Sequence, residues 1–193
     1  MGKRVYHVPY HLDARGIKGI TTDELKAILR GADELIMSGG RSLLAKLLKG
    51  SKEKKVLELG LDKCPAYGYF KDESLETVKA KIDWTIIHGY LDIEYDYRLP
   101  LLVFTPRGWE IEIETLTDEY IAQFDAMLEN SEPPYLMTYL KDKNRPLILR
   151  LLEKVEESKN PKYIPILKDW EKIDYKKVRQ RIRRVIKTLE QYQ

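Results

Sequence analysis

The sequence lacks several features that would place the protein in a membrane or in an oxidising compartment. It contains one cysteine, Cys64, which excludes an intramolecular disulfide and a cysteine-based zinc cluster. No apolar run approaches the roughly 18 residues of a membrane span, and no basic and apolar signal segment opens the chain. We therefore expect a cytoplasmic protein with no membrane partner. Association with the nucleoid is compatible with this location.

Sequence patterns that would indicate an enzyme are also missing. The chain has no Gly-x-x-x-x-Gly-Lys-Ser/Thr phosphate loop, so we expect no ATPase motor. His7 and His11 have the spacing of helical zinc ligands, but Pro9 between them prevents the helix. Three alternating carboxylates are interpreted as the solvent face of a strand: Glu110, Glu112 and Glu114. The sequence predicts a protein that is not an enzyme and has no metal or cofactor.

Charge is abundant and strongly segregated along the chain. Residues 1–55 carry 12 basic and 6 acidic side chains, residues 56–134 carry 6 and 17, and residues 135–193 carry 16 and 8. The small formal net charge of +3 is therefore a cancellation between basic ends and an acidic middle. Two basic segments are typical of a protein that meets polyanions, although a run of charge can also be a solvated face.

The pattern of apolar residues and turn residues predicts a mainly α-helical fold with one small β-hairpin. A helix capped at Thr21 or Thr22 belongs to an N-terminal extension, residues 1–39. Three helices follow, at about 41–49, at 52–59 with Ser51 as cap, and at 75–88 with Ser74 as cap. Two β-rich runs, 90–95 and 101–105, joined by a loop at 96–100, complete the order of a winged helix.

The rest of the chain is predicted to be helical. A helix at about 118–129 closes the winged-helix domain, which we place at residues 40–130, and the segment 130–134 is interpreted as a linker. Residues 135–193 form a C-terminal helical domain with helices near 145–157, 161–170 and 175–191, the last capped by Asp174. One helix pair in this domain has a HEAT-like pattern, which by itself cannot form a solenoid.

The stretch 40–108 resembles the winged-helix domain found at the C-terminus of RecQ helicases, the RQC domain. Four short segments carry the resemblance in the family's order: Leu47-Leu48-Lys49-Gly50-Ser51-Lys52, Ala66-Tyr67-Gly68-Tyr69-Phe70-Lys71, Ile87-His88-Gly89-Tyr90-Leu91 and Leu101-Leu102-Val103-Phe104-Thr105-Pro106-Arg107-Gly108. The whole chain is similar to a bacterial stand-alone group, the RQC-minor family, whose members are regarded as DNA-binding proteins. Phe70 replaces the second glycine of the family's pattern.

The resemblance implies a set of DNA contacts. A phosphate is held at the start of the second helix, by a group comprising Lys49, Gly50, Ser51, Lys52 and Lys55. A second element comprises Tyr67 and Lys71, and the wing tip comprises Tyr97 and Arg98, where the aromatic ring stacks on a terminal base pair. Free N–H groups at a helix start also bind anions on physical grounds. The alternatives are an ordinary serine cap with solvated lysines, and a tyrosine folded back on its own hairpin.

Two function classes follow. The first is a DNA binder that recognises duplex ends, forks or branches without strong sequence preference, because an acidic third helix would repel phosphates in a groove. The basic last helix offers it a second surface, with Arg179 and Arg183 at helical spacing, or else is simply a solvated amphipathic helix. The second class is a winged-helix adaptor that binds other proteins. DNA, and DNA-processing proteins beside it, are the expected partners.

Overall fold

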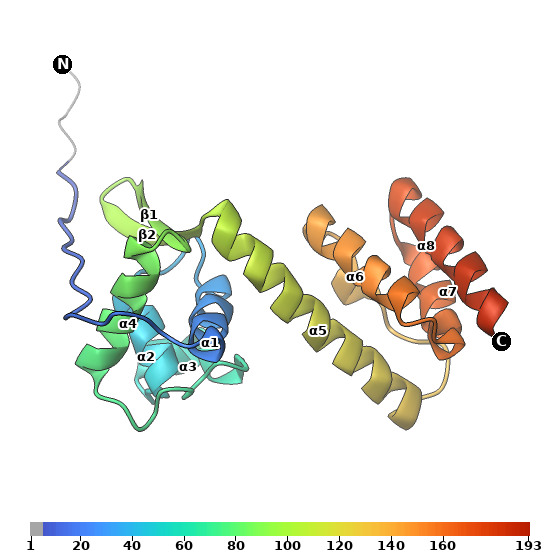
Figure 1. Cartoon of the computed structure of the whole chain (residues 1–193), viewed down its shortest axis with the longest axis horizontal. Helices are drawn as coiled ribbons and strands as arrows, with labels where there is room; N and C mark the ends of the chain where they lie inside the picture. The colour runs from blue at the N-terminus through green and yellow to red at the C-terminus, as the bar shows by residue number, and fades with distance from the viewer. Residues whose placement is uncertain (1–5) are drawn as a thin grey trace, which may run out of the picture. The chain divides into compact units, whose positions relative to one another are not determined.

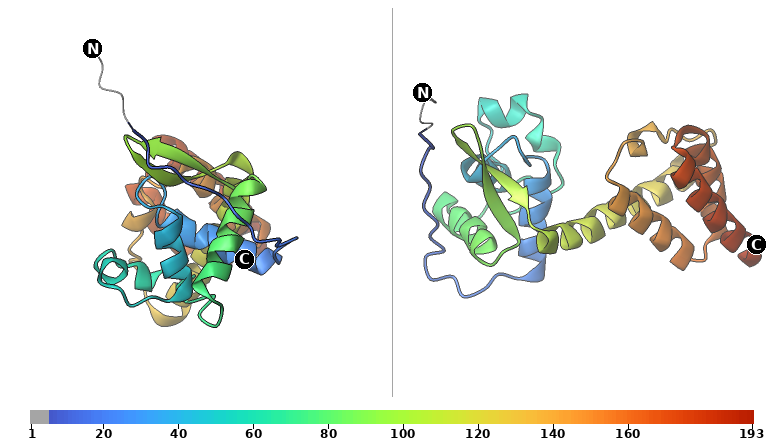
Figure 2. Two further views of the ribbon diagram at one scale, coloured as in Figure 1. Left: turned by 90° about the vertical axis from the view of Figure 1, so that its left-hand side faces the viewer. Right: turned by 90° about the horizontal axis from the view of Figure 1, so that it is seen from above.

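The computed structural model describes residues 6–193, which form two compact units (Figures 1 and 2). The first unit ends at Glu112 and the second runs from Ile113 to Gln193. The long helix α5, Pro106–Asn130, contributes residues to both. Within the described range, no helix is both long and apolar enough to cross a membrane.

The first unit is a winged helix. Its elements in chain order are α1 (Thr22–Asp33), α2 (Arg41–Lys49), α3 (Lys54–Glu58), a 3-10 turn (Leu61–Lys63), α4 (Leu75–Ile87), β1 (Leu91–Asp96) and β2 (Leu99–Phe104). A compact helical group followed by an antiparallel hairpin confirms the fold class predicted from the sequence. Figure 1 shows the hairpin beside α4.

Local sequence signals account for most of these helices. Thr21 and Glu24 form a capping box at α1, in which the Glu24 N–H donates to the Thr21 hydroxyl at 3.2 Å and the Thr21 N–H to the Glu24 carboxylate at 2.7 Å. Ser74 caps α4 in a similar way, through the N–H of Thr77 at 3.1 Å. The leucine face of α2 is buried with α1 and α4 in one core, as the spacing predicts.

The hairpin turn is tighter than the sequence suggested. Strands β1 and β2 pair from Leu91 with Phe104 to Asp96 with Leu99, which leaves only Tyr97 and Arg98 in the turn. The expected loop at 96–100 is therefore wrong. Pro100 is part of β2 because a proline is tolerated where a strand does not need its N–H for the ladder.

The second error concerns the start of α5, which the sequence placed near residue 118. The helix starts at Pro106, and the Thr105 hydroxyl accepts the N–H of Gly108 at 3.1 Å. Gly108 fits closely against the chain before the wing, since a Cβ there would lie 1.9 Å from the carbonyl oxygen of Tyr90. The carboxylates interpreted as the solvent face of a strand, Glu110, Glu112 and Glu114, lie on this helix instead. Residues two apart on a helix point in nearly opposite directions, so Glu110 is exposed whereas Glu112 is buried.

The second unit is helical and has its own core. Besides the later part of α5 it contains a 3-10 turn (Thr138–Leu140), α6 (Arg145–Glu157), a 3-10 turn (Pro161–Tyr163), α7 (Ile164–Ile173), α8 (Lys176–Leu189) and a last turn (Glu190–Tyr192). Trp170 and Phe124 are fully buried in this core, 6.2 Å apart at their ring centroids. Asp174 is not the cap of α8 as predicted. Its carboxylate accepts the indole N–H of Trp170 at 2.7 Å and the N–H of Tyr175 at 2.6 Å.

Candidate nucleic-acid interface

A left-handed glycine shapes the connection between α2 and α3. Gly50 ends α2 with φ of 73°, and the N–H groups of Gly50 and Ser51 donate to the carbonyls of Leu47 and Lys46 at 3.0 and 2.9 Å. The backbone of Gly50 also lies against Gly68, because a Cβ at Gly50 would stand 3.1 Å from the Gly68 Cα. The chain turns sharply here, and this turn presents the lysines that follow at the surface.

The loop that carries Tyr67 and Lys71 packs onto this connection. The Tyr67 hydroxyl donates to the Ser51 carbonyl at 3.0 Å, and the Lys49 ammonium group donates to the Lys71 carbonyl. Phe70 is buried in the core, and its N–H still donates to a carbonyl of α2 at 2.9 Å. The structure therefore brings the two sequence elements of the predicted phosphate site together, and we call residues 49–55 with 67–71 the basic corner.

Gly50→Ala is expected to lower the free energy of unfolding of the first unit by roughly 1–2 kcal/mol, because Ala is strained at a left-handed φ and its Cβ meets the Gly68 backbone. Gly60→Ala is the matched control, since Gly60 has a similar φ of 67° and no atom within 4 Å of an added Cβ. Chemical denaturation of the two variants separates the cost of the contact from the cost of the φ. Equal losses in both would show that the contact with Gly68 carries no energy.

Ser51 does not cap α3. The helix begins at Lys54 with Glu53 as its cap residue, and the Ser51 hydroxyl accepts the Glu53 N–H at 3.3 Å. The helix predicted at 52–59 is present but shorter, because Ser51 closes a short turn of its own, a local bond that competes with helix formation. The exposed cations of this corner that have no ion-pair partner within residues 6–193 are Lys52, Lys55 and Lys71, whereas Lys54 pairs with Glu58 at 3.5 Å.

The wing tip exposes an aromatic ring. Tyr97 lies at the two-residue turn with φ of 52°, and 72% of its surface is exposed. Its ring is therefore not folded back onto the hairpin. The neighbouring Arg98 is held in place, since its Nε donates to the Tyr6 carbonyl at 3.1 Å and its own carbonyl accepts the Val8 N–H at 2.9 Å.

The N-terminal segment lies along the hairpin, which the sequence did not reveal beyond the exclusion of a helix around Pro9. The Tyr95 hydroxyl donates to the Val8 carbonyl at 2.8 Å, and the rings of His7 and Tyr95 stack with centroids 4.2 Å apart. Further along, the Arg41 guanidinium donates to the His11 carbonyl at 2.9 Å. No group of three or more metal-ligating side chains occurs in the part of the chain that the structure describes. The aromatic side chains around Pro9 were the available signal for this packing.

The acidic side chains of α4 and its flanks are ion-paired. The pairs are Arg15–Glu76 at 2.6 Å, Arg41–Asp83 at 2.5 Å, and Lys81 with both Glu73, at 2.6 Å, and Glu24. Burial opposes the charged form of Lys81, but the hydrogen bonds that its ammonium group donates to Glu24 and Glu73 outweigh it and raise the pKa of this group. The N-terminal segment adds a hydrogen bond from the Asp13 N–H to Asp83 at 2.9 Å. The acidic side chains of this third helix, Glu76 and Asp83, are thus engaged within the chain.

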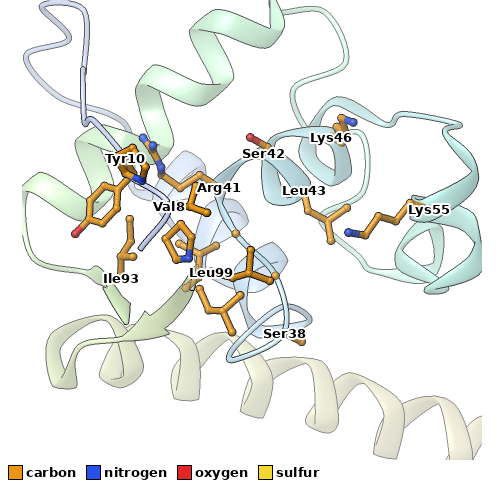
Figure 3. Close-up of a pocket in the computed structure, with 16 residues that line it drawn as sticks. Val8, Tyr10, Ser38, Arg41, Ser42, Leu43, Lys46, Lys55, Ile93 and Leu99 are labelled. Carbon is orange, nitrogen blue, oxygen red and sulfur yellow. The ribbon is translucent and has the colours of Figure 1, made fainter. Parts of the chain in front are cut away.

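A pocket of about 430 Å³ opens between the N-terminal segment, the start of α2 and β2 (Figure 3). Leu43 and Leu99 contribute apolar walls, and Arg41 and Lys55 are among its lining residues. Arg41 lies over the ring of Tyr10, 5.6 Å from the ring centroid. Lys55 therefore joins the basic corner to a recess beside the wing, which the sequence alone did not indicate.

The predicted basic face of α8 is less available than its spacing suggested. Arg183 pairs with Glu171 at 2.5 Å, and Arg179 is half-buried, with an Nε that is enclosed. Arg181, in between, pairs with Glu156 at 2.6 Å and, through this hydrogen bond, lowers the pKa of that carboxyl group. Structure and helical spacing agree on the face, but ion pairs consume part of its charge.

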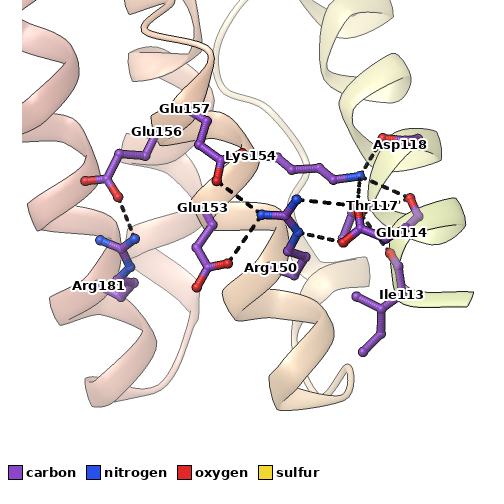
Figure 4. A network of polar contacts seen from close by, with 10 residues as sticks. All are labelled: Ile113, Glu114, Thr117, Asp118, Arg150, Glu153, Lys154, Glu156, Glu157 and Arg181. Atoms are coloured by element: carbon purple, nitrogen blue, oxygen red, sulfur yellow. Dashed lines mark hydrogen bonds and ion pairs between the residues drawn. The ribbon is translucent and has the colours of Figure 1, made fainter. Parts of the chain in front are cut away.

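A wider ion-pair network stabilises the second unit (Figure 4). Arg150 donates to Glu114 at 2.7 Å, and Lys154 pairs with Asp118 at 2.5 Å and with Glu114 at 3.0 Å. The hydrogen bonds from Arg150 and Lys154 hold the pKa of the Glu114 carboxyl group below its usual value. The cations of this network pair with Glu114 and Asp118 of α5, so they are structural rather than available to a ligand.

Together, a helical group, an antiparallel wing with an exposed aromatic residue and a basic corner beside it define a DNA-binding winged-helix domain. The model of one family, described as the RQC domain, matches residues 21–116. The chain therefore carries an RQC domain, and the match includes α1, which packs into the same core as α2 and α4. The RQC domain is not itself catalytic. Neither a curated protein nor a solved structure matches the chain.

Proposed function

We propose that the protein is a non-enzymatic DNA binder that recognises duplex ends, forks and branches without strong sequence preference. The division of the cations in the first unit carries this proposal. Arg15, Arg41 and Lys81 are ion-paired to acidic side chains on or beside α4. Lys79 on α4 has no ion pair in residues 6–193, but it is a single charge, whereas Lys52, Lys55 and Lys71, also without an ion pair in this range, lie together at the basic corner. Free cations attract phosphates, and contacts to phosphates orient DNA without reading its bases.

The wing supplies the preference for DNA structure in this proposal. A terminal or forked base pair has an exposed face, and an aromatic ring that projects into solvent is a suitable stacking platform. Tyr97 has this exposure, and the backbone hydrogen bond from the Val8 N–H to the Arg98 carbonyl anchors the tip that carries it. In this mechanism the lysines of the basic corner bind phosphates of the duplex, and the terminal base pair stacks on Tyr97.

Binding of the full chain to a blunt duplex should weaken steeply as salt rises. If the three free lysines of the basic corner each neutralise one phosphate, log affinity falls against log salt with a slope of about −3. Fluorescence anisotropy with blunt, forked and closed circular DNA measures both the slope and the preference for ends. A flat salt response, or no binding to any of these forms, would instead favour the adaptor function.

A further inference from the structure

The second unit contains a pocket of about 440 Å³ where α6 and α8 begin. The apolar residues among its lining are Leu140, Ile148 and Val178. The basic residues among its lining are Lys143, Arg145, Lys176 and Lys177. An apolar recess with cations around it matches a ligand that joins a flat apolar group to an anion.

The cations at this pocket differ from those that form the ion-pair networks of the unit. Arg150, Lys154, Arg181 and Arg183 are consumed by ion pairs. The four cations of the pocket have none with any residue from 6 to 193. Their charge is therefore available to an external anion.

The two carboxylates that line the pocket are already engaged. Asp142 accepts the Tyr175 hydroxyl at 2.5 Å. Asp174 is buried and accepts the Trp170 indole N–H at 2.7 Å and the Tyr175 N–H at 2.6 Å. These bonds orient both carboxylates toward their partners, and the pocket has a net positive charge because its four cations outnumber its two carboxylates.

An aromatic ring at the pocket provides a surface for a base. Tyr175 is 57% exposed, and its hydrogen bond to Asp142 limits the freedom of its ring. The Lys141 ammonium group lies 5.4 Å from the centroid of this ring. A fixed, exposed ring beside free cations is the arrangement with which proteins hold unpaired bases.

We propose that this pocket binds a nucleotide of single-stranded DNA, with its base against Tyr175 and the apolar lining and its phosphate among Lys143, Lys176 and Lys177. The choice of DNA as the polymer rests on the proposed function. The choice of a single strand rests on the pocket itself, because bases inside a duplex are stacked and cannot enter a recess. The site would hold a strand that continues from a fork or tail.

The test compares two triple variants of the full chain that lose the same charge. Lys143→Gln, Lys176→Gln and Lys177→Gln remove three of the four pocket cations. Lys162→Gln, Lys168→Gln and Lys187→Gln remove exposed cations that do not line the pocket and have no ion pair within the described range. Affinity is measured by anisotropy for a blunt duplex, for the same duplex with a tail of roughly ten thymidines, and for the thymidine strand alone.

The pocket variant should lose about tenfold or more in affinity for the tailed duplex and the free strand. Its affinity for the blunt duplex should match that of the control variant. An equal loss on blunt and tailed DNA, or no loss beyond the control on the free strand, would overturn the proposal. Failure of the protein to bind blunt duplex counts against the proposed function alone, because the free strand still tests the pocket.

Photocrosslinking locates the base. A tail that carries 5-bromodeoxyuridine should form an adduct with Tyr175, identified by mass spectrometry, and Tyr175→Ala should abolish it. Adducts confined to other residues would overturn the placement. A glutamate-rich peptide that displaces the thymidine strand as effectively as unlabelled strand would overturn it too, by showing that the pocket selects anions and not nucleotides.

Discussion

Tyr97→Ala is expected to weaken binding to blunt or forked DNA by about 1–3 kcal/mol and to leave binding to a closed duplex circle unchanged. The ring is 72% exposed at the turn of the wing and has no stacking partner within residues 6–193. Only DNA with an end or an opened base pair offers a face for it. The ratio of the two affinities, measured by anisotropy for each variant, isolates this contribution.

Three comparisons make the result specific. Tyr97→Phe should keep the ratio, since it retains the ring. Tyr69→Ala removes another exposed tyrosine, 48% exposed but outside the wing, and should leave the ratio unchanged. Arg98→Ala should weaken all DNA forms alike, because a phosphate contact carries no preference for ends. If the ratio does not move in Tyr97→Ala, while melting temperatures agree, the wedge mechanism does not apply to this protein.

Reversal of two charges at the basic corner should have the larger effect on duplex DNA. Lys52→Glu with Lys55→Glu is expected to reduce affinity for a blunt duplex on the order of 100-fold at moderate salt, because two phosphate contacts become repulsive. Both side chains are exposed, so the fold should be retained. The slope of log affinity against log salt should also become shallower by about 2.

The matched control reverses two other exposed lysines of the same unit, Lys63→Glu and Lys79→Glu. Lys79 lies on α4, the helix that enters the major groove in many winged-helix proteins. The control should lose only the weak, general effect of a lower net charge. If it loses as much affinity as the double variant at the basic corner, α4 faces the DNA, and the basic corner is not the main phosphate site.

Features that depend on neighbouring residues were predictable from the sequence. The capping residues Thr21 and Ser74, the leucine spacing of α2 and the left-handed Gly89 all act over a few positions, so the helices and the winged-helix order follow from local patterns. Local patterns were misleading where the same residues are compatible with two kinds of local structure. Ser51 reads as a helix cap but closes a turn, and alternating Ile and Glu residues read as a strand but lie on α5.

The segments of the RQC resemblance were visible because each is contiguous, and the sequence by itself therefore determined the winged-helix class and the lysines and the tyrosine of the candidate site. Only the tertiary structure decided which charges are free. Arg15 and Glu76 are 61 residues apart, and Arg150 and Glu114 are 36 apart. Spacing cannot reveal such pairs, because packing of distant elements creates them. Whether a cation is available to bind a ligand depends on the residues that surround it in the folded protein, and the sequence gives only its position along the chain.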